Sequence, residues 1–243
     1  MSNNDCAPSH LNQPRGLMKS YQELRISPQP TKRVRDTYLD INGQLVGKDL
    51  WLRRRTEEVV APQNYGKISP LEVAGEEWEA KVRLGGNYTD SQFEEVKGKE
   101  AVIDVLGKLA PGVSLDELAP FADLLTERQA WSVSNYPIGD MSIVLDSVTQ
   151  VSDKTPSSDT SAFCHGVGEV ELMAEVVGGG NEAKHMGRKK AQAEVLRARL
   201  DEFIEANAEL FPAKYGGGGK VAGKLSAYLE WKGKVQGGEE KME

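Results

Sequence analysis

The chain has 243 residues, enough for one large domain or two small ones, with 39% hydrophobic and 28% charged residues and a net charge of −7. Nucleic-acid binding normally leaves a basic surface, so the acidic balance argues against nucleic acid as the main partner. No apolar run approaches the length of a transmembrane helix, and residues 1–14 lack the apolar segment of a secretory signal.

The two cysteines, Cys6 and Cys164, lie far apart and form neither a zinc pattern nor a disulfide framework. A reducing, cytoplasmic compartment is therefore expected. We also expect a monomer that binds a small molecule and neither nucleic acid nor membrane.

The first third of the chain predicts a polar leader followed by strands. Residues 1–32 are rich in Pro and polar residues, and we expect them to be disordered or poorly ordered, with a short ordered piece at Leu17–Ile26. Strands are predicted at Val34–Leu39, Leu50–Arg55 and Trp78–Leu84. A turn at Asn42-Gly43 joins the first two, and a long loop over residues 56–77 precedes the third.

The rest of the chain mixes helices with further strands. Apolar spacing predicts a helix over Lys99–Leu109, and Ser114 with Glu117 forms a capping box for a short helix. Strands are predicted at Leu124–Val133, Met141–Val148 and Phe163–Val177, and helices at Ala183–Leu210 and Leu225–Trp231. Strands in hairpins with inserted helices favour an α+β protein built on an antiparallel sheet or barrel.

Charges alternate with apolar residues in three of these strands. Arg53 and Arg55 share one face of their strand, as do Glu79 and Lys81, and as do Glu169 and Glu171. Each strand taken alone is typical of a sheet with a solvated outer face. Taken together, the three strands can instead line an enclosed polar cavity that holds cations and carboxylates.

A metal-bound polyphosphate needs both kinds of charge. Arginine meets phosphate oxygens with two parallel hydrogen bonds, and Arg128, beside Trp131, adds a further cation to those on the strands. Glu169 and Glu171, two residues apart, can reach one Mg²⁺ ion, which prefers oxygen ligands.

The same residues resemble a known family. The chain is similar to thiamine triphosphatases of the CYTH superfamily, the triphosphate tunnel metalloenzymes, over roughly residues 33–232. The similarity is carried, in the family's order, by Arg35–Asp40, Leu50–Arg55, Trp78–Lys81, Phe93–Glu95, Thr126–Trp131, Val167–Leu172 and Gly223–Leu229. The resemblance implies an antiparallel β-barrel tunnel with outer helices over residues 33–232, and residues 233–243 are expected to be a solvated tail.

The resemblance also implies roles for individual residues. Phosphate-binding positions of the family fall on Arg53, Arg55, Lys81, Arg128 and Lys224. Metal-binding positions fall on Glu169 and Glu171, with Asp146 as the nearest candidate for a third ligand, although strict alignment places Val144 there. Trp51 is expected to stack against the cationic thiamine, because a ring face attracts cations.

The implied activity is hydrolysis of thiamine triphosphate to thiamine diphosphate and phosphate with Mg²⁺ or Mn²⁺. The alternatives are a non-catalytic triphosphate- or polyphosphate-binding module and an inorganic triphosphatase. One hallmark is absent, because no Glu-x-Glu-x-Lys segment precedes Arg35. We expect a truncated chain, with lost catalysis or a substitute segment as alternatives. A missing first barrel strand would leave sheet edges unpaired.

Overall fold

The computed structural model describes residues 25–60, 75–85, 91–134, 140–151, 162–175, 182–208 and 222–239. Its strands are β1 (Arg25–Pro28), β2 (Lys32–Asp40), β3 (Leu50–Val59), β4 (Glu77–Gly85), β5 (Gln92–Lys97), β6 (Ala119–Ser134), β7 (Asp140–Gln150) and β8 (Cys164–Met173). Its helices are α1 (Lys99–Leu109), α2 (Glu182–Ala206) and α3 (Lys224–Glu239), with short 3-10 turns η1 (Val46–Lys48) and η2 (Leu115–Glu117).

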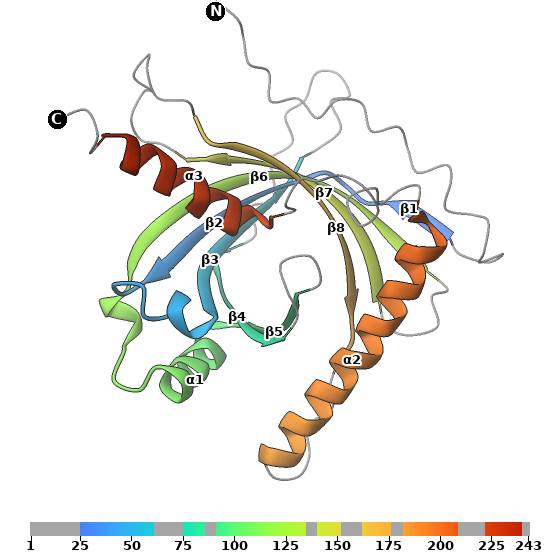
Figure 1. The fold of residues 1–243 in the computed structure, drawn as a ribbon, viewed down its shortest axis with the longest axis horizontal. Coiled ribbons are helices and arrows are strands. Elements are labelled where there is room, and N and C mark those ends of the chain that lie inside the picture. The colour runs from blue at the N-terminus through green and yellow to red at the C-terminus, as the bar shows by residue number, and fades with distance from the viewer. Residues whose placement is uncertain are drawn as a thin grey trace, which may run out of the picture.

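One antiparallel sheet contains all of these strands, which confirms the expected α+β class. The order is β5-β4-β3-β2-β6-β7-β8, and β1 pairs with the end of β6 in line with β2. Figure 1 shows the sheet curling so that β4 and β5 approach the region enclosed by the other strands. In the described part of the chain, β5 and β8 end the sheet without pairing with each other, so hydrogen bonds do not close it into a barrel.

The outer, convex face is covered by two helices. Val102 and Leu106 of α1 pack against a buried cluster that includes Leu50 and Leu52 of β3. Further along the same face, Phe203 of α2 is fully buried against strands β6 and β7. Near its other end α2 carries Lys189, which forms an ion pair with Glu94 of β5. Helix α2 lies beside β8 in Figure 1, and this ion pair connects it to β5, the strand at the opposite edge of the sheet.

Helix α3 lies on the opposite, concave face, whereas the sequence predicted only outer helices. Its Leu225 and Tyr228 pack with Tyr38, Leu124 and Val148, which are buried on that face. The cause is the apolar stripe of α3, which meets a patch of the same character on β2, β6 and β7. One end of the concave face is thus apolar and filled, and the rest is polar.

Several predicted boundaries move in the structure. The strand predicted to end at Arg55 continues to Val59, because Lys32 to Arg35 of β2 supply pairing partners as far as that residue. Strand β5 was not predicted. Strand β1 lies inside the segment expected to be poorly ordered, and α3 extends past residue 232 to Glu239.

Some local predictions are confirmed. Helix α1 has the predicted ends, and Ser114 and Glu117 form the capping box. Asn42 and Gly43 both adopt positive φ in the predicted turn, at 52° and 75°. Most of the predicted loop over residues 56–77, and the segment 17–24, lie outside the described residues.

Within the described residues, no helix is both long and apolar enough to cross a membrane.

Candidate functional site

The charged face of the three alternating strands is the concave face of the sheet. Residues directly opposite each other on neighbouring strands point to the same side. Arg53 lies opposite Tyr38 and Glu79, and Arg55 lies opposite Asp36. The same face continues through Trp51 opposite Lys81, Leu124 opposite Asp36, Arg128 opposite Asp146, Glu169 opposite Val144 and Glu171 opposite Ser142.

The charged side chains at the centre of this face are not solvated strand surfaces. Arg53, Arg55 and Glu79 are all at least nine-tenths buried, so the interpretation of three independent solvated strands is wrong for these residues.

Asp36 is the centre of the charge network. It is 0% exposed and accepts hydrogen bonds from Nε and Nη2 of Arg55 at 2.7 and 2.9 Å. Nζ of Lys224 donates to the same carboxylate at 2.8 Å, and Nε of Arg53 lies 3.5 Å away. Burial opposes ionisation of Asp36, but the charges of Arg53, Lys224 and Arg55 outweigh it and hold the pKa far below the ordinary value.

Arg53 is bound by a second buried carboxylate. Its Nε and Nη2 donate to Oε2 of Glu79 at 2.8 and 2.6 Å, and its Nη1 donates to the Tyr38 hydroxyl at 3.4 Å. Burial again opposes ionisation, but Arg53 and Arg55 together lower the pKa of Glu79. In the described part of the chain, Oε1 of Glu79 is buried and accepts no hydrogen bond, although Lys97 lies 3.5 Å from it.

Arg128 and Asp146 form a similar pair on β6 and β7. Nε and Nη2 of Arg128 donate to the two oxygens of Asp146 at 2.8 and 2.7 Å. Asp146 is 4% exposed, and each of its carboxylate oxygens accepts a hydrogen bond from Arg128. The residue that the sequence offered as a third metal ligand is thus the partner of a predicted phosphate-binding arginine.

Glu169 and Glu171 lie beyond this pair on β8. Ser142 Oγ donates to Glu171 at 3.4 Å, and Val144 stands opposite Glu169. Burial raises the pKa of Glu169, and the nearby charges of Glu171 and Asp146 raise it further, more than Lys81 and Lys224 compensate. This corner of the face therefore carries an excess of negative charge.

These two glutamates can hold a divalent metal ion. Magnesium is commonly bound through one or two carboxylates, with substrate phosphates supplying further oxygens. Among the described residues, no three His, Cys, Asp or Glu side chains form a metal-binding group. Two carboxylates alone would leave most of the coordination positions of such an ion to water or to ligand oxygens.

Lys81 and Trp51 lie side by side at the β3–β4 end of the face. Lys81 Nζ is 2.5 Å from Glu95 on β5 and 5.8 Å from the Phe93 ring centroid. The Trp51 ring packs on Phe93 with centroids 5.0 Å apart, and Trp51 also contacts the buried cluster of α3. Both side chains are only partly buried.

Lys224 reaches the network from a different part of the chain. It is the first residue of α3, and its side chain is 12% exposed. His165 Nε2 lies 2.9 Å from the carbonyl oxygen of Ala222, two residues before the helix. The start of α3 is therefore fixed to the sheet at two points, one of them the central carboxylate.

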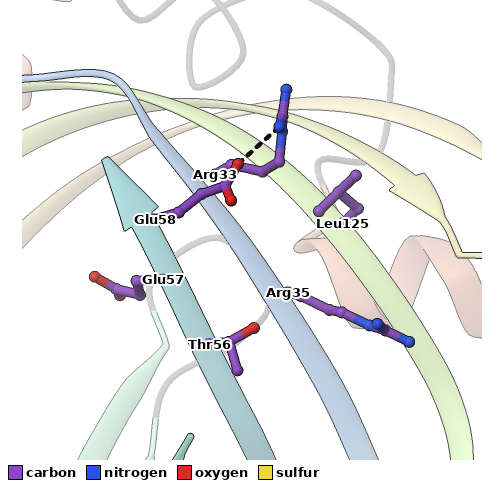
Figure 2. Close-up of a pocket in the computed structure, with 6 residues that line it drawn as sticks. All are labelled: Arg33, Arg35, Thr56, Glu57, Glu58 and Leu125. Atoms are coloured by element: carbon purple, nitrogen blue, oxygen red, sulfur yellow. Dashed lines mark hydrogen bonds and ion pairs between the residues drawn. The ribbon is translucent and has the colours of Figure 1, made fainter. Parts of the chain in front are cut away.

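The hollow shown in Figure 2 lies away from this network. It is lined by Arg33, Arg35, Thr56, Glu57, Glu58 and Leu125, most of which point to the convex side of β2, β3 and β6. Arg33 is paired with Glu58, and Arg35 is paired with Asp123. A second hollow shares Arg35 and Thr56 and extends to Arg54 and Glu76. These polar hollows are the solvated outer surface of the sheet.

Sequence reasoning missed three carboxylates of the network. Asp36 was noted only as part of a motif, Glu79 only as a neighbour of Lys81, and Glu95 not at all as a site residue. A signal for Asp36 exists, because an acidic residue between Val34 and Tyr38 in strand alternation must point to the buried side. Only the register, which places it opposite Arg55, explains why that burial is tolerated.

Comparison with known proteins adds little to this geometry. No family model matches the chain, and no curated protein matches it. Among solved structures, the PH1819 protein from Pyrococcus horikoshii OT3 is similar with 13% identity over 72% of this chain and 78% of that one, at a TM-score of 0.34. A similarity of that size supports no conclusion about fold or function.

Proposed function

We propose that the chain binds a triphosphate together with a divalent metal ion and hydrolyses thiamine triphosphate to thiamine diphosphate and phosphate. The observation that carries the proposal is the convergence of Arg53, Arg55 and Lys224 on one buried carboxylate, on the same face as Arg128 and the Glu169–Glu171 pair. The resemblance to CYTH thiamine triphosphatases supports the choice of substrate, and an enclosed tunnel is part of the same proposal.

The proposed reaction breaks the bond between the terminal phosphorus and its bridging oxygen. Water supplies the new oxygen and loses a proton, so the products are thiamine diphosphate and phosphate. The arginines and Lys224 bind the phosphate oxygens and neutralise their charge. Glu169 and Glu171 would hold Mg²⁺ or Mn²⁺, which when bound supplies further charge neutralisation on the phosphates.

A non-catalytic polyphosphate-binding module is the second candidate. It is favoured by the engagement of Asp146 with Arg128, which leaves two carboxylates rather than three for a metal. The cationic residues would then bind the anion without turnover. An inorganic triphosphatase differs from the leading proposal only in its substrate.

Phosphate release from thiamine triphosphate, with and without Mg²⁺, tests the leading proposal. We expect release that requires the metal and falls roughly 100-fold or more in Glu169→Gln and Glu171→Gln, since each removes a charge from the metal site. Glu127→Gln, on the exposed outer side of β6, is the matched control and should keep full activity.

The same preparation separates the alternatives. Binding of thiamine triphosphate by calorimetry without phosphate release would favour the module. Faster release from inorganic triphosphate than from thiamine triphosphate would favour the inorganic triphosphatase. If neither compound binds, every form of the proposal is wrong.

A further inference from the structure

Three arginines on the concave face are held in the same way. A carboxylate accepts hydrogen bonds from Nε and Nη2 of each guanidinium: Glu79 for Arg53, Asp36 for Arg55 and Asp146 for Arg128. All six donor–acceptor distances lie between 2.6 and 2.9 Å. The three carboxylates come from three different strands, β4, β2 and β7.

This arrangement leaves the Nη1 side of each guanidinium less engaged. Nη1 of Arg53 makes only a long hydrogen bond of 3.4 Å to Tyr38, and Nη1 of Arg55 lies 3.7 and 3.6 Å from Glu57 and Glu79. Within the described residues, Nη1 of Arg128 forms neither a hydrogen bond nor an ion pair. Each Nη1 carries two N–H donors, so each arginine retains donors for a second anion.

Two effects of such a carboxylate on anion binding oppose each other. Its negative charge repels a bound phosphate and competes for the guanidinium. Its two hydrogen bonds also fix a long, flexible side chain in one orientation, so that less entropy is lost when the arginine binds an anion. Where the second effect is larger, removing the negative charge weakens anion binding, although the site becomes more positive.

We propose that Asp36, Glu79 and Asp146 are positioning residues that hold Arg53, Arg55 and Arg128 by one edge so that Nη1 can bind the phosphate chain. This assigns Asp146 to Arg128 and leaves the metal ion to Glu169 and Glu171. The inference rests on the polyphosphate binding of the proposed function, but it does not require turnover.

Asp146→Asn is the sharpest test, because Arg128 is the most accessible of the three arginines, with a side chain 18% exposed. Calorimetric titration with inorganic triphosphate, without metal, should show a dissociation constant about tenfold higher than that of the native chain. Asp123→Asn alters the similar two-bond pair of Arg35 on the convex face and should leave the constant unchanged.

A double-mutant cycle separates positioning from a general structural role. In an Arg128→Ala background, Asp146→Asn should not weaken triphosphate binding further, because Asp146 acts through the arginine. A general loss of structure would weaken binding in both backgrounds. Titration with Mn²⁺ alone should show a much larger loss of affinity for Glu169→Gln, which removes a proposed ligand, than for Asp146→Asn, which removes only a nearby charge.

The outcomes divide clearly. If the native chain binds triphosphate while Asp146→Asn binds it equally or more tightly, the positioning role is wrong and the proposed function stands. A loss of Mn²⁺ affinity in Asp146→Asn as large as that in Glu169→Gln would restore Asp146 as a metal ligand and also contradict the inference. If the native chain does not bind triphosphate, the proposed function fails and the inference fails with it.

Discussion

The two halves of the concave face are built differently. At the buried centre on β2–β4, three cations, Arg53, Arg55 and Lys224, meet two carboxylates, Asp36 and Glu79. On β6–β8 one cation, Arg128, meets the carboxylate of Asp146 in the presence of two more acids, Glu169 and Glu171. The first half has one more cation than carboxylates and is largely buried, and the second carries excess negative charge.

The difference shows in which half the buried charges already have partners of opposite sign. In the central half every buried charge has a close partner, as burial of charge requires. In the acidic half the raised pKa of Glu169 shows that its negative charge is poorly compensated. An added cation would stabilise the acidic half, whereas removal of any partner would damage the central half.

The largest effect should follow from removing the central carboxylate. Asp36→Ala leaves Arg55, Arg53 and Lys224 without their shared partner in a buried site, so we expect the free energy of unfolding to fall by about 3–5 kcal/mol. The control is Asp123→Ala, which removes the partner of Arg35 on the outer face, where the two side chains are 50% and 26% exposed. Its cost should be about 0–1 kcal/mol.

Urea denaturation followed by circular dichroism measures both costs. Equal costs for the two variants would show that the central cluster contributes no more than a surface ion pair. The comparison is closely matched, because both carboxylates accept two hydrogen bonds from an arginine and both pairs involve β2.

Acid should weaken the central half first. The pKa of Asp36 lies below its ordinary value of 3.8, so the native state binds this proton less readily than the unfolded state. The stabilisation from Asp36 is therefore present above pH 3.8 and is lost as pH falls towards the lower native pKa, by on the order of 2–3 kcal/mol.

The pH dependence of unfolding tests this sign. Stability of the native chain, measured by urea denaturation from pH 6 downward, should fall more steeply below pH 4 than stability of Asp36→Asn. Parallel curves would mean that Asp36 is not ionised against Arg53, Arg55 and Lys224 in the folded protein.

The acidic half should respond in the opposite direction. Glu169→Gln removes one of several like charges, so we expect the metal-free protein to become more stable by up to about 1 kcal/mol. Glu127→Gln on the exposed outer side of β6 should change stability little. Thermal unfolding in EDTA measures both, and a destabilised Glu169→Gln would show that the glutamate is already well compensated.

Much of this architecture was predictable, and the limits have physical causes. Apolar spacing located α1 to the residue, and strand alternation placed Arg53 with Arg55, and Glu169 with Glu171, on one face of their own strands. Strand β5 was not predicted because Phe93-Glu94-Glu95-Val96 is short and carries adjacent charges. Only pairing with β4 makes this segment a strand. The partners of the arginines depend on register, which is set by contacts between distant segments.

The smallest expected effect is that of Trp51 substitutions on ligand affinity. Trp51 lies on the central half of the face and is the residue proposed to contact the thiamine group of the substrate. If its ring stacks on the cationic thiamine, Trp51→Phe should weaken binding of thiamine triphosphate by about 0.5–1 kcal/mol, because Phe presents a poorer ring face to a cation. Inorganic triphosphate has no such group and serves as the internal reference for any disturbance of the contact with Phe93. Equal changes for both ligands in Trp51→Phe and Trp51→Ala would assign Trp51 to packing alone, whereas a loss confined to thiamine triphosphate would place the thiamine at the β3–β4 end of the concave face.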